Sequence, residues 1–169
     1  AQVAGLGWHR ILLAGQPQVT GPFLQQLPES AAAQVAATVD ANLIWEDHAA
    51  VAERLDGAIR DAGLQQSRAL ADEAVSLAYA GGDAAIGWPE VADSLVRHRV
   101  DHLIVAADAV LDPAVLGPHT QAALGWPSPQ MLVERAVEQA VISGAEVTVL
   151  PADAPELVRA GGAAAILRY

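Results

Sequence analysis

The sequence of 169 residues contains no cysteine, no lysine and few aromatic residues. The absence of cysteine excludes disulfide bonds, thiolate catalysis and zinc–cysteine sites. Aromatic residues make up only 4% of the chain, so its core must consist mainly of alanine, valine, leucine and isoleucine. No apolar run reaches the length of a membrane span, and no charged-then-apolar signal peptide opens the chain. We therefore expect a soluble cytoplasmic protein that makes no contact with membranes.

Basic residues are scarce throughout the chain. The only basic side chains besides histidine are nine arginines, which face twenty acidic residues and leave a formal net charge of −11. Acid exceeds base both in residues 1–63 and in residues 64–169. A domain that binds the phosphates of a nucleic acid needs a basic face, and this sequence contains no cluster of basic residues. The sequence therefore predicts no direct nucleic-acid binding by this chain.

Hydrophobic residues make up 53% of the chain and charged residues 17%, which is enough apolar material for a packed core. Short apolar runs predict strands, and these runs are residues 8–14, 35–39, 84–86, 102–106, 146–150 and 163–167. Apolar residues at helical spacing predict helices, the strongest being 47–62, 66–80 and 128–143, with shorter ones after Thr20, Gly87 and Ala154. The stretch 109–125 carries Pro113 and Pro118 and is expected to be a loop.

Glycines set the expected limits of the helices. Asp47 is expected to cap the first long helix and Gly63 to end it, with a second helix following from Gln66. We place a domain boundary near Gly63, which gives domains 1–63 and 64–169. Strands that alternate with helices over the second of these indicate an α/β sandwich with a largely parallel or mixed sheet.

The last nine residues, Gly-Gly-Ala-Ala-Ala-Ile-Leu-Arg-Tyr, predict a buried strand released by two glycines. They also resemble the closing segment of the last domain of Pelota and the eukaryotic and archaeal class-I release factors. Further matching pieces occur in the order of that superfamily; they are Asp72–Val75, Ala84–Gly87, Pro89–Leu95, Val100–Val105 and Ser143–Val147. His9–Gly15, Phe23-Leu24 and Leu27-Pro28 resemble the second half of its middle domain.

The resemblance implies that residues 64–169 form an α/β/α sandwich with the fold of kink-turn-binding ribosomal proteins. It implies that residues 1–63 are part of an RNase H-like middle domain. Alanine richness, the lack of lysine and the Leu27-Pro28 pair suggest the bacterial, Balon-like branch. The chain begins without methionine, so we expect a fragment of a longer protein, whose missing strands would leave an edge for pairing with a second copy.

Two hallmarks of the wider superfamily are not found in this sequence. The Gly-Gly-Gln loop of release factors would precede Ala1, and Gly15-Gln16-Pro17 is not that motif. The basic segment that contacts RNA in kink-turn binders is replaced by residues 87–93, which include Glu90 and Asp93 and would repel phosphate.

By resemblance, the chain belongs to a ribosome-associated factor of hibernation or rescue. It is expected to act through protein contacts, without catalysis or cofactor. The implied partners are the ribosome and a translational GTPase of the EF-Tu type. A long, proline-bearing loop is a common place for such contacts. The expected contact surface is the loop from Ala109 to Pro127 and the start of the following helix, with the apolar anchors Leu111, Val115, Leu116 and Trp126.

Other readings of single residues stay open. Asp108 follows the best strand of the chain, where open α/β sheets bind ligands, so a small hydrolytic enzyme is one alternative. An acidic adaptor unrelated to translation is another. His98 and His102 are four residues apart, but a change from helix to strand between them argues against a metal site. Trp88, which precedes a proline as Trp126 does, is either a packing anchor or an exposed contact residue.

Overall fold

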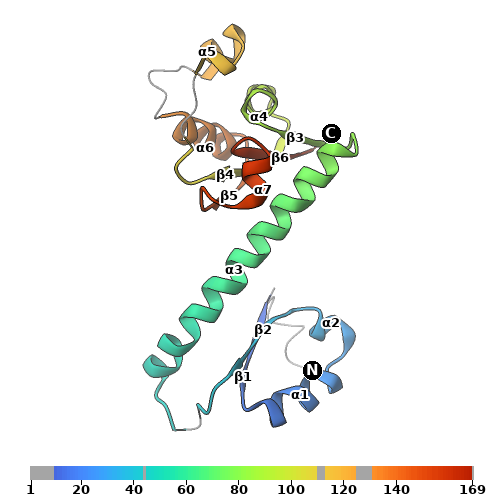
Figure 1. Cartoon of the computed structure of the whole chain (residues 1–169), viewed down its shortest axis with the longest axis vertical. Helices are drawn as coiled ribbons and strands as arrows, with labels where there is room; N and C mark the ends of the chain where they lie inside the picture. Colours follow the sequence, from blue (N-terminus) through green and yellow to red (C-terminus); the bar gives the residue numbers. More distant parts are fainter. Residues whose placement is uncertain (1–9, 44, 110–112, 125–130, 169) are drawn as a thin grey trace. The chain divides into compact units, whose positions relative to one another are not determined.

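The computed structural model describes residues 10–43, 45–109, 113–124 and 131–168. The chain divides into two compact units, which we call unit 1 (Ala1–Gln65) and unit 2 (Gln66–Tyr169). Each unit contains its own sheet, so the α/β class expected from the sequence is confirmed. Figure 1 shows the elements of both units in chain order.

Unit 1 contains two parallel strands joined through two helices. Strand β1 (Ile11–Gly15) pairs with β2 (Val35–Asp40), and helices α1 (Pro17–Gln26) and α2 (Glu29–Ala32) lie between them in the chain. The sequence placed the start of the first helix at Thr20, which is wrong. Proline fits the first turn because its missing N–H is not needed there, so α1 begins at Pro17. Thr20 is buried inside the helix, and its hydroxyl donates to the carbonyl of Gln16 at 3.3 Å.

A single helix, α3 (His48–Tyr79), contains residues of both units. It begins as the sequence predicts, because Asp47 Oδ1 accepts a hydrogen bond from the backbone N–H of Ala50 at 2.9 Å. The break expected at Gly63 does not occur. An internal glycine costs a helix only about 1 kcal/mol, and the strong helix formers on either side outweigh that cost. The helix ends at Tyr79, and Gly81 follows with a φ of +72°, which no helix can continue.

Unit 2 has a four-stranded mixed sheet with the strand order β3-β6-β4-β5. Its strands are β3 (Ala84–Ile86), β4 (Val100–Ala106), β5 (Glu146–Leu150) and β6 (Ala163–Leu167). Its helices after α3 are α4 (Trp88–Val96), the 3-10 turn η2 (Pro113–Val115), α5 (Pro118–Leu124), α6 (Leu132–Ile142) and α7 (Pro155–Arg159). Strands β4 and β5 are parallel, whereas β6 runs antiparallel to both of its neighbours. The closing strand therefore lies inside the sheet, as its apolar sequence predicts.

Alternating side chains of the central strands build a core on each face of this sheet. Leu103 and Val105 of β4 join the core that contains the buried residues of α4 and α6. Ile104 lies between them in the strand and is equally buried, so it points to the opposite face. Buried residues outside the first core come from α3 and α7, among them Ala71, Ala74 and Leu157. The result is an α/β/α sandwich, the architecture expected for the C-terminal domain.

Small residues allow β6 to enter the sheet. Gly161 and Gly162 have φ angles of +66° and +90°, and the following Ala163 is fully buried. Trp88 is only 2% exposed and lies beside Gly162, so it is a packing anchor and not an exposed contact residue. Within the described ranges, no helix is both long and apolar enough to cross a membrane.

Candidate functional site

The segment that the sequence assigned to a loop is partly helical. Residues Pro113–Val115 form η2, and Pro118 opens α5 at a position where proline is favoured. The expectation of an irregular stretch over 109–125 is therefore wrong for these two parts. Prolines were read as evidence against helix, but they exclude it only from the interior and support its first turn.

The four residues predicted to anchor a partner have different surroundings. Val115 is 51% exposed, and it is available to a partner. Leu116 is only 3% exposed and belongs to the core of unit 2, where its carbonyl also accepts a hydrogen bond from Gln121 Nε2 at 2.7 Å. Leu111 and Trp126 lie outside the described residues. Of the predicted anchors that the structure describes, Val115 is therefore the exposed one.

Unit 2 also has a shallow groove between α5 and α6. It has a volume of about 270 Å³ and is lined by Ala123, Leu124, Arg135, Glu138, Gln139 and Ile142. Ile142 is 69% exposed, whereas Arg135 and Glu138 pair with each other at 2.6 Å. An apolar side chain beside a neutralised ion pair is suited to protein contact. The sequence contains no signal for this groove, because its lining comes from two helices and includes Ile142, an exposed apolar residue.

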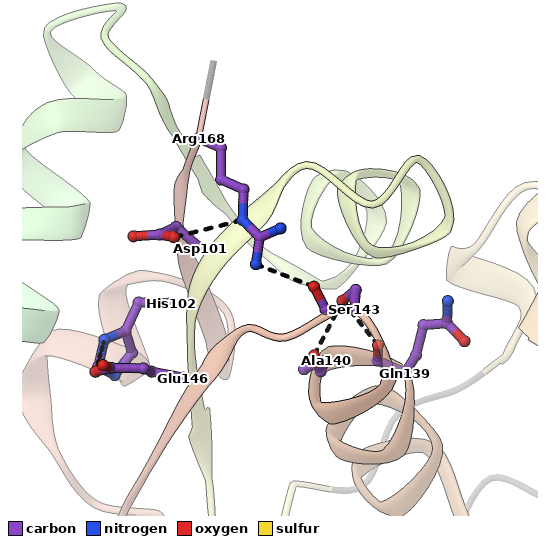
Figure 2. Close-up of polar contacts among 7 residues, drawn as sticks. All are labelled: Asp101, His102, Gln139, Ala140, Ser143, Glu146 and Arg168. Carbon is purple, nitrogen blue, oxygen red and sulfur yellow. Dashed lines mark hydrogen bonds and ion pairs between the residues drawn. The ribbon is translucent and has the colours of Figure 1, made fainter.

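The end of α6 is fastened to the closing strand by polar contacts (Figure 2). Arg168 donates to the carbonyl of Ser143 at 3.1 Å and lies 3.4 Å from a carboxylate oxygen of Asp101. The hydroxyl of Ser143 donates to the carbonyls of Gln139 and Ala140, each at 2.9 Å. The Arg168 bond gives a partner to the Ser143 carbonyl at the end of the helix, whereas the carbonyls of Gln139 and Ala140 also accept backbone N–H groups from Ser143 and Ala145. Their role is to hold α6, and with it the groove, in place.

A second polar cluster lies on neighbouring strands of unit 2, and Figure 2 shows two of its members, His102 and Glu146. His102 of β4 is 2.7 Å from Thr148 Oγ1 through Nε2 and 3.4 Å from Glu146 through Nδ1. Both residues belong to β5, and the His102 side chain is 17% exposed. An open cleft of about 330 Å³ adjoins the cluster and is lined on α3 by Gln66, Ala69, Leu70 and Glu73. Both nitrogens of the His102 ring already face a partner on β5. We therefore infer that the cluster is structural and links β4 to β5.

The alternative chemical sites receive no support from the geometry. Asp108 is exposed in the turn after β4, and no described residue forms a hydrogen bond or ion pair with its carboxylate. His98 lies beyond the end of α4 with a φ of +56°, so it does not share a helical face with His102. Among the described residues, no three histidine, aspartate or glutamate side chains are grouped so as to hold a metal ion.

The arginines are mostly engaged with acids of the same chain. Six of the nine form ion pairs with carboxylates: Arg54, Arg60, Arg97, Arg135, Arg159 and Arg168. Where kink-turn binders are basic, α4 instead carries exposed Glu90, and Asp93 is paired with Arg97 at 3.0 Å. This arrangement leaves little positive charge for phosphates.

No family model and no curated protein matches the sequence. Solved structures do resemble the fold. Pelota from Archaeoglobus fulgidus is 18% identical, with a TM-score of 0.57 over 99% of this chain and 51% of its own. Ribosome-bound archaeal Pelota, described together with ABCE1, is 19% identical, with a TM-score of 0.56 over 95% of this chain and 43% of its own. Dom34 from S. cerevisiae, a translation termination-like factor that interacts with Hbs1, is 16% identical, with a TM-score of 0.55 over 95% of this chain and 47% of its own.

These likenesses establish the fold of the chain. Its structural neighbours are Pelota and release-factor-like proteins, so the resemblance read from the sequence is confirmed at the level of the fold. The chain spans about half the length of each of these proteins. Assignment to the bacterial branch stays a prediction.

Proposed function

We propose that this chain is the C-terminal part of a ribosome-associated translation factor of the Pelota and release-factor type. The observation that carries the proposal is the likeness to Pelota over 99% of the chain, which includes both units and the helix α3 that contains residues of each. One of the similar structures is described as ribosome-bound, and another as interacting with Hbs1. Such a factor acts in the cytoplasm, in hibernation or rescue of ribosomes.

In this proposal, residues 1–63 correspond to part of the middle domain and residues 64–169 to the C-terminal domain. The chain contributes binding and no catalysis, and it needs no cofactor. Its net charge of −11 and its paired arginines favour contact with proteins over contact with ribosomal RNA. The proposed partner is a translational GTPase of the EF-Tu type or the proteins of the ribosomal GTPase centre.

The proposed contact surface lies on unit 2. It consists of exposed Val115 and the groove between α5 and α6, together with the predicted anchors Leu111 and Trp126, which lie outside the described residues. Leu116 supports this surface from the core and does not touch the partner.

The strands β1 and β2 pair only with each other among the described residues, so we also propose that a free edge of this pair can recruit a second copy. Light scattering of the isolated chain would show that dimer.

The test is co-sedimentation of the full-length protein with ribosomes, with and without a purified translational GTPase. We expect the wild type to co-sediment and Val115→Asp to lose most of its binding, because a charge would be buried against an apolar contact. Val158→Asp is the matched control, since Val158 is 64% exposed on α7 and lies outside the proposed surface. If the wild type binds neither ribosomes nor the GTPase, the proposed function is wrong. If Val115→Asp binds as well as the control, the surface is wrong.

A further inference from the structure

Unit 1 contains an apolar pocket at the carboxyl ends of its two parallel strands. The pocket has a volume of about 370 Å³ and is lined by Ala14, Gly15, Gln16, Val19, Ala41, Asn42 and Leu43. The carboxyl ends of parallel strands are a common location for ligands, because the connecting loops diverge there and leave a crevice. The volume lies at the low end of the range for ligand pockets, so a single large side chain would suit it.

Close packing and backbone hydrogen bonds fix the side of this pocket that β1 and α1 form. Gly15 ends β1, and a Cβ atom at this position would lie only 3.0 Å from Cγ2 of Thr20. The backbone carbonyl of Gln16 accepts hydrogen bonds from the N–H groups of Val19 and Thr20, at 2.8 and 3.0 Å. These bonds fix the first turn of α1, which holds Val19 at the rim with 65% of its surface exposed.

Further exposed apolar groups belong to the same unit. Phe23 follows Val19 by one helical turn on the same face of α1 and is 53% exposed. Trp45 comes two residues after Leu43, which lines the pocket, and is 91% exposed. An indole that is almost wholly in water gains a large apolar area when a partner covers it. The side chains of Gln16 and Asn42 are exposed at the rim and supply donors and acceptors for a peptide backbone.

The charges near the pocket decide which kind of partner fits. Asp40 directly precedes Ala41, is exposed, and forms no hydrogen bond or ion pair through its carboxylate with any described residue. Glu46 and Asp47 follow in the same connection, while Arg54 is held by Glu46 at 2.8 Å. Arg10 precedes the amino end of β1, at the opposite end of the strand from the pocket. Asp40 is thus an exposed carboxylate one residue from the pocket lining, and it favours a cationic peptide over the phosphates of a nucleotide.

We propose that this pocket binds a basic protein segment that inserts one bulky apolar side chain between Val19, Ala41 and Leu43. Lysine or arginine residues beside the inserted side chain meet Asp40, and Trp45 and Phe23 cover the flanks. The site lies on unit 1 and is separate from the surface proposed above on unit 2. A failure to bind ribosomes or a GTPase would therefore not decide this proposal, whereas the dimer proposed for unit 1 involves the same two strands.

The test is selection of a random twelve-residue peptide display library on the immobilised chain, followed by sequencing. We expect the enriched peptides to carry one leucine, isoleucine, methionine or phenylalanine flanked by lysine or arginine. Val19→Asp should lower their enrichment at least about tenfold, because the apolar contact is lost and a second carboxylate enters the rim. Val158→Asp, equally exposed but in unit 2, should leave the enrichment unchanged. Circular dichroism of both variants confirms that they fold alike.

Several outcomes would overturn the proposal. They are the absence of enriched peptides, enrichment of peptides without basic residues, and equal enrichment on Val19→Asp. A titration with adenosine monophosphate provides a separate arm, because Gln16 and Asn42 could also pair with a base edge. If that nucleotide shifts the amide NMR signals of Gly15 and Asn42 saturably and no peptide is enriched, the ligand of the pocket is a nucleotide and the peptide proposal is wrong. Conversion of a dimer to a monomer by Val19→Asp would assign the pocket to self-association.

Discussion

At the scale of single residues, Gly162 controls how the closing strand enters the core. Its φ of +90° is strained for any residue with a Cβ atom, and such an atom would lie 3.1 Å from Nε1 of buried Trp88. We expect Gly162→Ala to lower the free energy of unfolding of unit 2 by about 2–3 kcal/mol, because backbone strain and a displaced indole add together. Urea denaturation followed by tryptophan fluorescence measures this loss.

The control for this change is Gly57→Ala in α3. A Cβ atom at Gly57 would meet nothing within 4 Å, and the position is helical, so alanine should be neutral or slightly stabilising there. Equal effects of the two substitutions would contradict the role given to Gly162.

The sequence predicted part of this arrangement. Two glycines before an apolar run are a local signal, and they correctly indicated a strand entry. The burial of Trp88 has no local signal, since a tryptophan at the start of a helix can face either solvent or core. Only the position of β6 between β3 and β4 decides that it faces the core.

At the scale of elements, the continuity of α3 through Gly63 separates two interpretations of one glycine. A glycine that ends a helix has a positive φ, so its replacement by alanine destabilises the protein. A glycine inside a helix has a helical φ, so its replacement by alanine stabilises the protein. A Cβ atom at Gly63 would meet nothing within 4 Å, and its φ is not positive. We expect Gly63→Ala to raise the free energy of unfolding by about 0.5–1 kcal/mol.

Thermal and urea denaturation followed by circular dichroism at 222 nm would measure the effect of Gly63→Ala. Gly63→Pro is the complementary variant, and it should reduce the helical signal and cost about 3 kcal/mol or more. A loss of stability with alanine would show that the helix ends at Gly63 in solution.

Strands were easier to predict than helix limits in this chain. Apolar runs bounded by glycine or aspartate correctly located β2, β3, β4, β5 and β6. The wrong helix limits are those at Gly63, Thr20 and Pro118. Each of these residues can stand either at the end of a helix or at another position, inside the helix or in a loop. Tertiary packing and neighbouring propensity decide between such positions, and neither can be read from the residue itself.

The candidate sites show the same limit. Val115 and Leu116 are adjacent and chemically alike, yet one is exposed and the other is in the core. Composition suggested apolar anchors in that segment but could not distinguish the two. The pocket of unit 1 was missed because its lining comes from the ends of β1 and β2, which lie far apart in the sequence.

At the scale of the whole molecule, the two units should differ in local stability. Unit 1 relies on two strands, and every residue of β1 is only half-buried. Unit 2 has fully buried residues in both β4 and β6. Two-stranded sheets are marginal by themselves, whereas core strands exchange only through larger unfolding.

We therefore expect amide hydrogens of β4 and β6 to exchange at least about a hundredfold more slowly than those of β1 and β2. Hydrogen–deuterium exchange with mass spectrometry would measure this, with α3 peptides on either side of Gly63 as internal references. Equal protection of the two sheets would contradict the expectation, and it would indicate that unit 1 is stabilised by contacts that its own elements do not provide.

The charge of the whole chain leads to a last prediction, which concerns RNA. The fold of unit 2 is the one expected for a relative of kink-turn binders, but fold does not determine ligand. With a net charge of −11 and six of nine arginines held in ion pairs, the chain has few cations with which to release counterions from a phosphate backbone. We expect no saturable binding to kink-turn or duplex RNA at physiological salt in fluorescence anisotropy, with a kink-turn-binding ribosomal protein as the positive control. Micromolar affinity that falls steeply as salt is added would contradict this. It would mean that arginines leave their carboxylates to pair with phosphate, and the proposal that this chain acts through protein contacts would then be wrong.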